Sequence, residues 1–152
     1  EPALLDRYLS RFFAIFLGIE SFSDKTLARM KTNLTRRKIR SAIRELERKG
    51  VIIVASFLVG SPWDTRATLQ EIEDFIMQEL PASSIQLLNI MTPFPGTRFY
   101  NTVKKEGLLL TDDICRFNGQ HLLYRHPVFK EGELEERIQN FYFRFFNERY
   151  TG

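Results

Sequence analysis

Three turns in this sequence carry the polar residues that could bind a small ligand. The first is Gly18-Ile19-Glu20-Ser21, the second runs from Gly60 to Thr65, and the third runs from Thr92 to Thr97. Carboxylate and hydroxyl oxygens accept hydrogen bonds, and glycine and proline let a backbone approach a ligand in a fixed turn. Taken singly, each turn also fits a solvated carboxylate or an ordinary rigid loop. Their occurrence in order, each after an apolar segment, favours one shared site.

Other kinds of site have little support in the sequence. The single cysteine, Cys115, rules out an internal disulfide. His121 and His126 lie five residues apart without a neighbouring carboxylate cluster, which does not indicate a metal site. There is no phosphate-cradling G-x-x-x-x-G-K-[ST] loop, and no nucleophile elbow supports a Ser–His–Asp triad.

The elements that must position the turns are strands alternating with helices. Apolar segments predict strands over 14–18, 51–59 and 84–90, and the 51–59 segment is apolar on both faces, as a parallel strand covered on both sides should be. Helices are predicted from Asp24, over 36–49, over a segment ending before Pro81, and up to Gly107. This alternation indicates an α/β fold with a parallel sheet, whose turns after the strands share one edge.

The pattern changes after residue 107. Asn118-Gly119, between 114–117 and 121–124, predicts a hairpin, and an aromatic stripe from about Gly132 predicts a last helix. We therefore divide the chain into residues 1–107, which carry the alternating elements, and a C-terminal extension over residues 108–152.

Composition and charge narrow the function classes. Hydrophobic residues make up 43% and charged residues 27%, which is typical of a globular domain. No apolar run is long enough for a membrane span and no signal peptide is visible, so we expect a cytoplasmic protein without membrane contact. The net charge of +3 reflects a basic cluster within 36–49. Nucleic-acid binding is one interpretation, but the solvated face of an amphipathic helix is favoured.

The turns, together with Ala28-Arg29-Met30-Lys31, resemble the radical S-adenosylmethionine (SAM) superfamily from its fourth barrel strand onward. The familiar forms are a G-x-E/Q-S turn, an L-x-x-M-K/R segment, a G-x-P-x-E-T turn and a T-P-x-P-G-T turn. The resemblance covers about residues 14–107. It looks closest to the cobalamin-binding class, which includes the anaerobic magnesium-protoporphyrin monomethyl ester oxidative cyclases.

The resemblance implies the C-terminal half of a partial (β/α) barrel, with parallel strands and covering helices. In such enzymes a C-x-x-x-C-x-x-C motif binds a [4Fe–4S] cluster, and reductive cleavage of SAM gives a 5′-deoxyadenosyl radical that acts on a small-molecule substrate. That motif would precede Glu1, so we expect the missing N-terminal half of the same protein to hold the cluster and this chain alone to be inactive. The substrate, tetrapyrrole-like or other, and the use of cobalamin stay open.

The resemblance also implies a half-site for SAM. Glu20, with Ser21 beside it, would accept the ribose hydroxyls, Lys31 would meet the methionine carboxylate, and the strand end at 91–93 would border adenine. Ser56 stands where some relatives place an aspartate against the ribose. The predicted cofactor-binding residues are thus Glu20, Ser21, Lys31, Ser56, Gly60, Pro62, Thr92 and Pro93.

Two residues depart from the familiar pattern. Trp63 replaces the usual glycine, and either stacks on a ligand or plugs the barrel mouth. Asp64 replaces the usual glutamate, and we interpret it as the N-cap of the following helix rather than as a ligand contact.

Two rival functions and one consequence of truncation remain. The chain could be the RNA-binding part of a radical SAM tRNA methylthiotransferase, or a structural α/β fragment without ligand affinity. As half a barrel, it would expose a sheet edge around Phe16, and would self-associate there or cover the edge by refolding the segment before Phe12.

Overall fold

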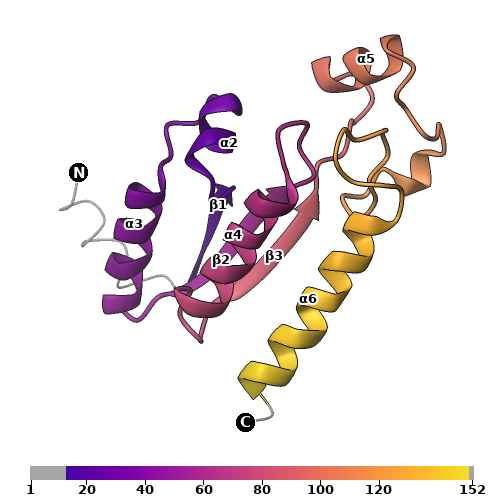
Figure 1. Cartoon of the computed structure of the whole chain (residues 1–152). Coiled ribbons are helices and arrows are strands. Elements are labelled where there is room, and N and C mark those ends of the chain that lie inside the picture. Colours follow the sequence, from indigo (N-terminus) through magenta and orange to yellow (C-terminus); the bar gives the residue numbers. More distant parts are fainter. Residues whose placement is uncertain (1–12, 151–152) are drawn as a thin grey trace. The chain divides into compact units, whose positions relative to one another are not determined.

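Strands and helices alternate through most of residues 13–150, the part of the chain that the computed structural model describes (Figure 1). The strands form one sheet in the order β1-β2-β3, and all run parallel. This confirms the predicted α/β class with covering helices. In chain order the elements are β1 (Ala14–Glu20), α2 (Asp24–Arg29), α3 (Arg36–Arg48), β2 (Ile52–Val59), α4 (Arg66–Gln78), β3 (Ile85–Ile90), α5 (Arg98–Lys105), the 3-10 helix η1 (Ile114–Arg116) and α6 (Glu133–Tyr150).

Each of the predicted turns follows the C-terminal end of a strand. Glu20 is the last residue of β1, Gly60 follows β2 directly, and Thr92 comes two residues after β3. The pairing of β1 with β2 is regular from Ala14, opposite Ile52, to Gly18. There the register shifts by one residue, which is a β-bulge at the end of the strand.

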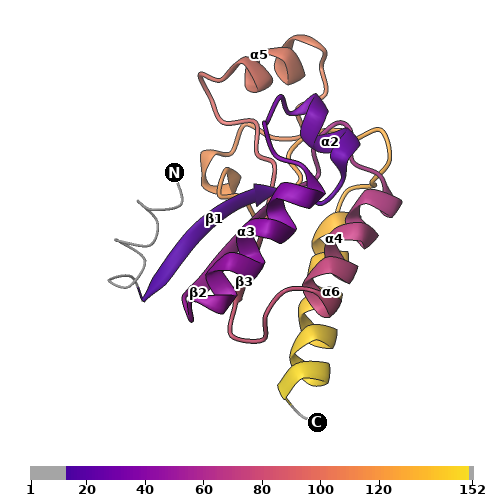
Figure 2. The same ribbon diagram turned by 90° about the vertical axis from the view of Figure 1, so that its left-hand side faces the viewer.

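The chain divides into two compact units. The first comprises residues 13–57 of the described chain with Gln70–Leu87, and the second comprises Leu58–Leu69 with the chain from Leu88 onward. In the first unit α3 and the greater part of α4 cover one face of the strands (Figure 2). Phe57 of β2 contacts Phe75 of α4 edge to face, and Phe75 also stacks on Phe22 with ring centroids 3.9 Å apart.

The second face of the strands is much less covered within the first unit. Along β2 the residues alternate between buried and half-buried, so Ile53, Ala55 and Phe57 are buried while Val54 and Ser56 are not. On the neighbouring strand Phe16 is 63% exposed. The expectation that β2 is covered on both sides is therefore wrong for the described residues. One-sided cover is the pattern of a (β/α) barrel wall, whose inner face needs further strands to close over it.

The bounds of α3 agree with the helix predicted over 36–49. The Thr35 side chain accepts a hydrogen bond from the Lys38 N–H at 3.3 Å, and Gly50 ends the helix with φ at 69°. None of the helices described in residues 13–150 is long and apolar enough to cross a membrane.

In the second unit the antiparallel pairing of the extension lies elsewhere than predicted. Leu109 bridges Tyr124, so the arms are 108–110 and 123–125. The segment predicted as the first arm, 114–117, instead contains η1, because the Asp113 side chain accepts the Cys115 N–H and starts a tight turn. Asn118-Gly119 belongs to a longer loop.

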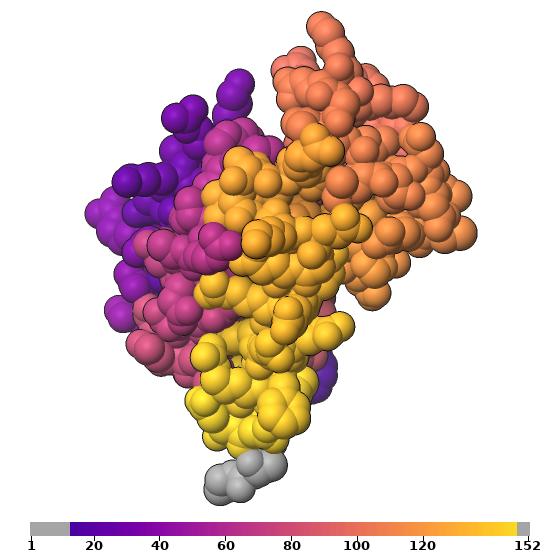
Figure 3. All heavy atoms as spheres, turned by 45° about the vertical axis from the view of Figure 1, so that its right-hand side comes forward, coloured from indigo at the N-terminus to yellow at the C-terminus, as the bar shows by residue number. Residues whose placement is uncertain are grey.

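The extension also covers the outer edge of β3. The Leu88 N–H donates to the Tyr142 hydroxyl at 3.0 Å, and the Ile90 N–H donates to the Gly119 carbonyl at 2.6 Å. Leu134 and Phe145 of α6 are fully buried. Figure 3 shows the atoms of this extension, orange to yellow, as one continuous surface. Pairing these N–H groups protects an otherwise open sheet edge.

Candidate functional site

Glu20 occupies an unusual backbone position at the end of β1. Its φ is 65°, in the left-handed region that a residue with a Cβ rarely adopts. The bulge between Gly18 and Glu20 produces this conformation, and an ideal Cβ built on Gly18 would lie 2.7 Å from the Glu20 Oε1 atom. The carboxylate thus folds back over Gly18, whose missing side chain leaves it room.

The Glu20 carboxylate is an acceptor without a partner. It makes no hydrogen bond or ion pair with any residue in 13–150, and partial burial raises its pKa above the usual glutamate value. Ser56 is the residue paired with Gly18 on β2, and it lies on the less covered face of that strand. The structure therefore places Glu20 and Ser56 next to Gly18, Glu20 through the bulge on β1 and Ser56 as the residue paired with Gly18 on β2.

Lys31 holds the second unusual backbone position, with φ at 58°. It follows the C-cap of α2, where the Lys31 N–H donates to the Ala28 carbonyl and the Thr32 N–H donates to the Leu27 carbonyl. These two bonds define a Schellman motif, whose left-handed residue is usually glycine. The Lys31 ammonium is exposed and has no partner among the described residues.

Ser21 lies buried in the turn that follows Glu20. Its side chain is fully buried, and its hydroxyl accepts the Ser23 N–H at 3.2 Å. The Ser21 N–H donates to the Ile19 carbonyl at 2.8 Å. These bonds fix the turn that follows Glu20, so the structure gives Ser21 a positioning task.

In the second unit, the turn after β2 is clamped by the C-terminal extension. The Tyr124 hydroxyl donates to the Gly60 carbonyl at 2.7 Å, and burial, with the nearby Asp64 charge, raises the Tyr124 pKa. Gly60 has φ at 73°, and a Cβ there would lie 2.6 Å from the Cδ2 atom of Leu134. Glycine at this position is thus required by close packing against α6.

His126 holds the next residue of the same turn. Its Nδ1 atom accepts the N–H groups of Val128 and Phe129 at 3.0 and 3.2 Å, so this nitrogen carries no proton. The Nε2 atom therefore carries the proton, and donates it to the Ser61 carbonyl at 2.7 Å. The sequence around His126 does not predict this clamp. No group of three metal-binding side chains occurs within the described residues.

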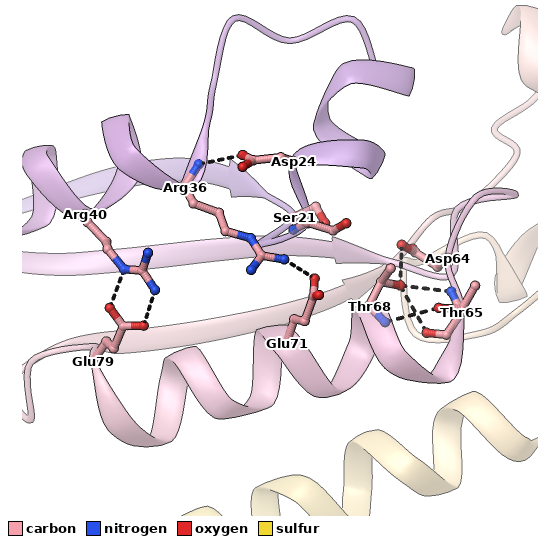
Figure 4. A network of polar contacts seen from close by, with 10 residues as sticks. Ser21, Asp24, Arg36, Arg40, Asp64, Thr65, Thr68, Glu71 and Glu79 are labelled. Atoms are coloured by element: carbon pink, nitrogen blue, oxygen red, sulfur yellow. Dashed lines mark hydrogen bonds and ion pairs between the residues drawn. The ribbon is translucent and has the colours of Figure 1, made fainter.

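The predicted capping role of Asp64 is wrong, because α4 begins one residue later and Thr65 is its cap. The Thr65 Oγ1 atom accepts the Thr68 N–H at 3.2 Å. Asp64 is buried and closes the turn, since its Oδ2 atom accepts the Ser61 N–H at 2.9 Å and its Oδ1 atom accepts the Thr68 hydroxyl at 3.2 Å (Figure 4). Burial raises the pKa of Asp64, and these hydrogen bonds oppose the rise.

In the turn after β3, the side chains of the predicted site residues Thr92 and Pro93 are buried, so only backbone groups could meet a ligand there. Thr92 is buried, and its hydroxyl donates to the Ile90 carbonyl at 3.1 Å. Pro93 is also buried, whereas Phe94 is exposed. The Met91 N–H donates to the Val59 carbonyl at 2.8 Å, so the turns after β2 and β3 start side by side.

A pocket opens beside these two turns in the second unit. It has a volume of about 780 Å³ and is lined mostly by apolar side chains. Pro62 and Trp63 come from the turn after β2, and the other walls come from Met91, α5 and residues 124–127. Trp63 is 41% exposed, so it forms part of a pocket wall rather than a buried plug. A pocket of this size and character suits a small ligand.

Two arginines on the basic face of α3 form ion pairs with α4 within the first unit. Arg40 makes a bidentate ion pair with Glu79 at 2.5 and 2.6 Å, and Arg36 pairs with Glu71 (Figure 4). Both guanidinium groups also lie over the Phe22 ring. These arginines fasten α3 to α4.

Comparison with known proteins finds methyl-transferring and methylthio-transferring relatives at low identity. The chain is 26% identical over 113 residues to a bacteriochlorophyllide d C-8(2)-methyltransferase of Chlorobaculum tepidum, which covers 73% of this chain and 25% of that protein. It is 29% identical over 132 residues to a hopanoid C-2 methylase of Rhodopseudomonas palustris, covering 84% and 24%.

A third relative carries the name "Putative methylthiotransferase" and comes from Methanocaldococcus jannaschii. It is 36% identical over 100 residues, or 62% of this chain and 22% of that protein. The chain thus spans about a quarter of the length of the curated relatives it matches. No protein-family model matches the chain.

Proposed function

We propose that this chain is the SAM-binding half of a radical SAM barrel, in an enzyme that transfers a methyl or methylthio group. The observation that carries the proposal is the Glu20 carboxylate, which has no partner among residues 13–150 and is held by a bulge over Gly18, the residue paired with Ser56. The similarity to methyl-transferring proteins supports the reaction class.

The residues present fit SAM. Glu20 and Ser56 supply acceptors for the ribose hydroxyls, and the exposed Lys31 ammonium supplies a cation for the methionine carboxylate. The backbone at Thr92 and Pro93, after β3, supplies hydrogen-bonding groups for the edge of adenine. Gly60 and Pro62 shape the turn after β2, and Ser21 fixes the turn after β1. SAM, when bound and reduced, supplies the radical or methyl chemistry, and the task of these residues is to bind and orient it.

The described residues do not fit an iron–sulfur cluster. Cys115 is their single cysteine, and no group of metal-binding side chains lies among them. We therefore propose that another segment of the full-length protein holds the [4Fe–4S] cluster, and any cobalamin as well. The same segment would complete the barrel over the open face of β2. The division into residues 1–107 and a C-terminal extension belongs to this proposal.

The substrate proposal takes its class from the relatives. The names of two relatives specify a bacteriochlorophyllide and a hopanoid, both large ring systems. We propose an apolar polycyclic substrate, tetrapyrrole-like or terpenoid. The RNA-binding alternative has the methylthiotransferase relative in its favour. Against it, Glu71 and Glu79 already neutralise two arginines of the basic helix.

Isothermal titration of SAM into the full-length protein tests the proposal. Glu20→Ala and Lys31→Ala should each weaken binding by roughly 1–3 kcal/mol, the contribution of a hydrogen bond to a charged group. Glu47→Ala, on the exposed face of α3, is the matched control and should change nothing. Undiminished affinity in both test variants would refute the assignment. Tight SAM binding by the isolated chain would also contradict it, because the cluster iron should be needed.

A further inference from the structure

The pocket of the second unit contains features that the proposed SAM contacts do not use. Its apolar wall includes the Trp63 indole and the Phe99 ring, and Phe99 packs edge to face on Tyr124 with centroids 5.2 Å apart. Tyr124 is itself fixed by its bond to the Gly60 carbonyl. The wall is therefore rigidly connected to the clamped turn, which is a preformed arrangement suited to a flat apolar ligand.

Two guanidinium groups line the same pocket. Arg98, at the start of α5, and Arg125 are exposed, and their side chains form no ion pair, hydrogen bond or ring contact with other described residues. By contrast, Arg66 in the same unit pairs with Glu133. Glu106 is the one acidic residue among those lining the pocket, so its rim carries a positive excess.

We propose that this pocket binds an amphiphilic anion: a rigid apolar ring system whose carboxylate groups meet Arg98 and Arg125. The apolar walls remove the ring system from water, and the two cations, each able to form a bidentate pair, select for the acid over a neutral analogue. Identification of this ligand as the methyl acceptor rests on the proposed function. Binding of such an anion does not depend on it.

Trp63 provides a direct probe, because it is the single tryptophan of the chain and forms part of the pocket wall. We would titrate the chain with pyrenebutyrate and with pyrenebutanol, which share one ring system and differ in the carboxylate, and follow energy transfer from Trp63 to pyrene. Pyrenebutyrate should bind about tenfold more tightly than pyrenebutanol, as expected for a charge-assisted contact. The double variant Arg98→Gln/Arg125→Gln should reduce that ratio to less than about twofold.

Arg116→Gln is the matched control, because Arg116 is an exposed arginine of the same unit outside the pocket. It should keep the full preference for the acid. Equal affinity for the acid and the alcohol in the native chain would overturn the proposal, as would a preference that survives the double substitution. Because the titration needs neither SAM nor a cluster, failure of SAM binding in the full-length protein would leave its result unaffected, and the two proposals fail separately.

Discussion

Replacing Lys31 by glycine should make the protein more stable and the proposed cofactor site weaker. Lys31 is the left-handed residue of the Schellman motif that ends α2. The left-handed conformation costs a residue with a Cβ roughly 1–2 kcal/mol. Glycine avoids that cost but gives back about 0.5–1 kcal/mol through its larger backbone entropy in the unfolded chain. The net expected gain in the free energy of unfolding is therefore between about 0 and 1.5 kcal/mol, with a central value of about 0.75 kcal/mol.

The expected gain in the free energy of unfolding is measured by urea unfolding of the chain, monitored by circular dichroism. Lys31→Ala keeps the strained backbone and should leave stability within about 0.5 kcal/mol of the native value. Lys25→Gly is the same substitution as the test, placed within α2, and should destabilise by up to about 1 kcal/mol. A Lys31→Gly variant that is less stable than the native chain would refute the assigned backbone conformation.

The expected loss of SAM affinity is measured by titrating SAM into the full-length protein. Lys31→Gly and Lys31→Ala both remove the ammonium, so both should lose roughly 1–3 kcal/mol of SAM binding. For Lys31→Gly, the free energy of unfolding should therefore rise while the affinity for SAM falls. A glycine variant that is more stable and binds SAM normally would show that the lysine side chain has no part in the cofactor site.

Three further outcomes are expected from the structure. Gly60→Ala should destabilise the chain by roughly 2–4 kcal/mol in urea unfolding. The added Cβ would hold a left-handed φ and lie 2.6 Å from the side chain of the buried Leu134. A loss of stability below about 1 kcal/mol would contradict the packing described. The raised pKa of Asp64 means that the folded state retains this proton to a higher pH than the unfolded state, so the free energy of unfolding should fall as the pH rises from about 4 through the folded pKa. Asp64→Asn should flatten that decline, the exposed Asp112→Asn should not, and identical profiles for the two variants would count against a buried, ionising Asp64. Sedimentation velocity over a concentration series should show self-association of the isolated chain. The reason is that β1 is an edge strand of the described sheet and Phe16 is exposed. A strictly monomeric chain would indicate that this edge is covered.

The order and type of the elements could be predicted because their signals are local. Hydrophobic periodicity and caps such as Thr35 and Gly50 depend on residues within one or two turns of each other. The arms of the C-terminal pairing could not be placed in the same way. Asn118-Gly119 has the composition of a hairpin turn, but the Asp113 cap and the bond from Ile90 to Gly119 draw those residues into other contacts. The proposed cover of the β1 edge by the segment before Phe12 lies outside the described residues.

The clamp on the turn after β2 could not be seen in the sequence for a different reason. Tyr124 and His126 lie more than sixty residues from Gly60 and Ser61, and nothing in their own neighbourhood indicates a carbonyl partner. A buried tyrosine or histidine needs a hydrogen-bond partner, but burial alone does not indicate which group that partner is. Asp64 shows the same limit, because a carboxylate near a helix start fits both a cap and a loop closure until the helix boundary is known.

Three helices of the described chain end in the same way but differ in the residue that takes the left-handed position. Helices α2, α3 and α5 end in the same pair of Schellman hydrogen bonds, each with one residue in the left-handed region. Gly50 and Gly107 hold that position after α3 and α5, where a Cβ would meet nothing within 4 Å, so the backbone conformation alone accounts for glycine. After α2 the same conformation is held by Lys31, at an energetic cost that glycine would remove. Glu20 is the other non-glycine residue with a positive φ within the described chain. Strain of this type persists where the side chain is needed, and both side chains are charged and make no hydrogen bond or ion pair with other residues in 13–150, which supports the proposed ligand site.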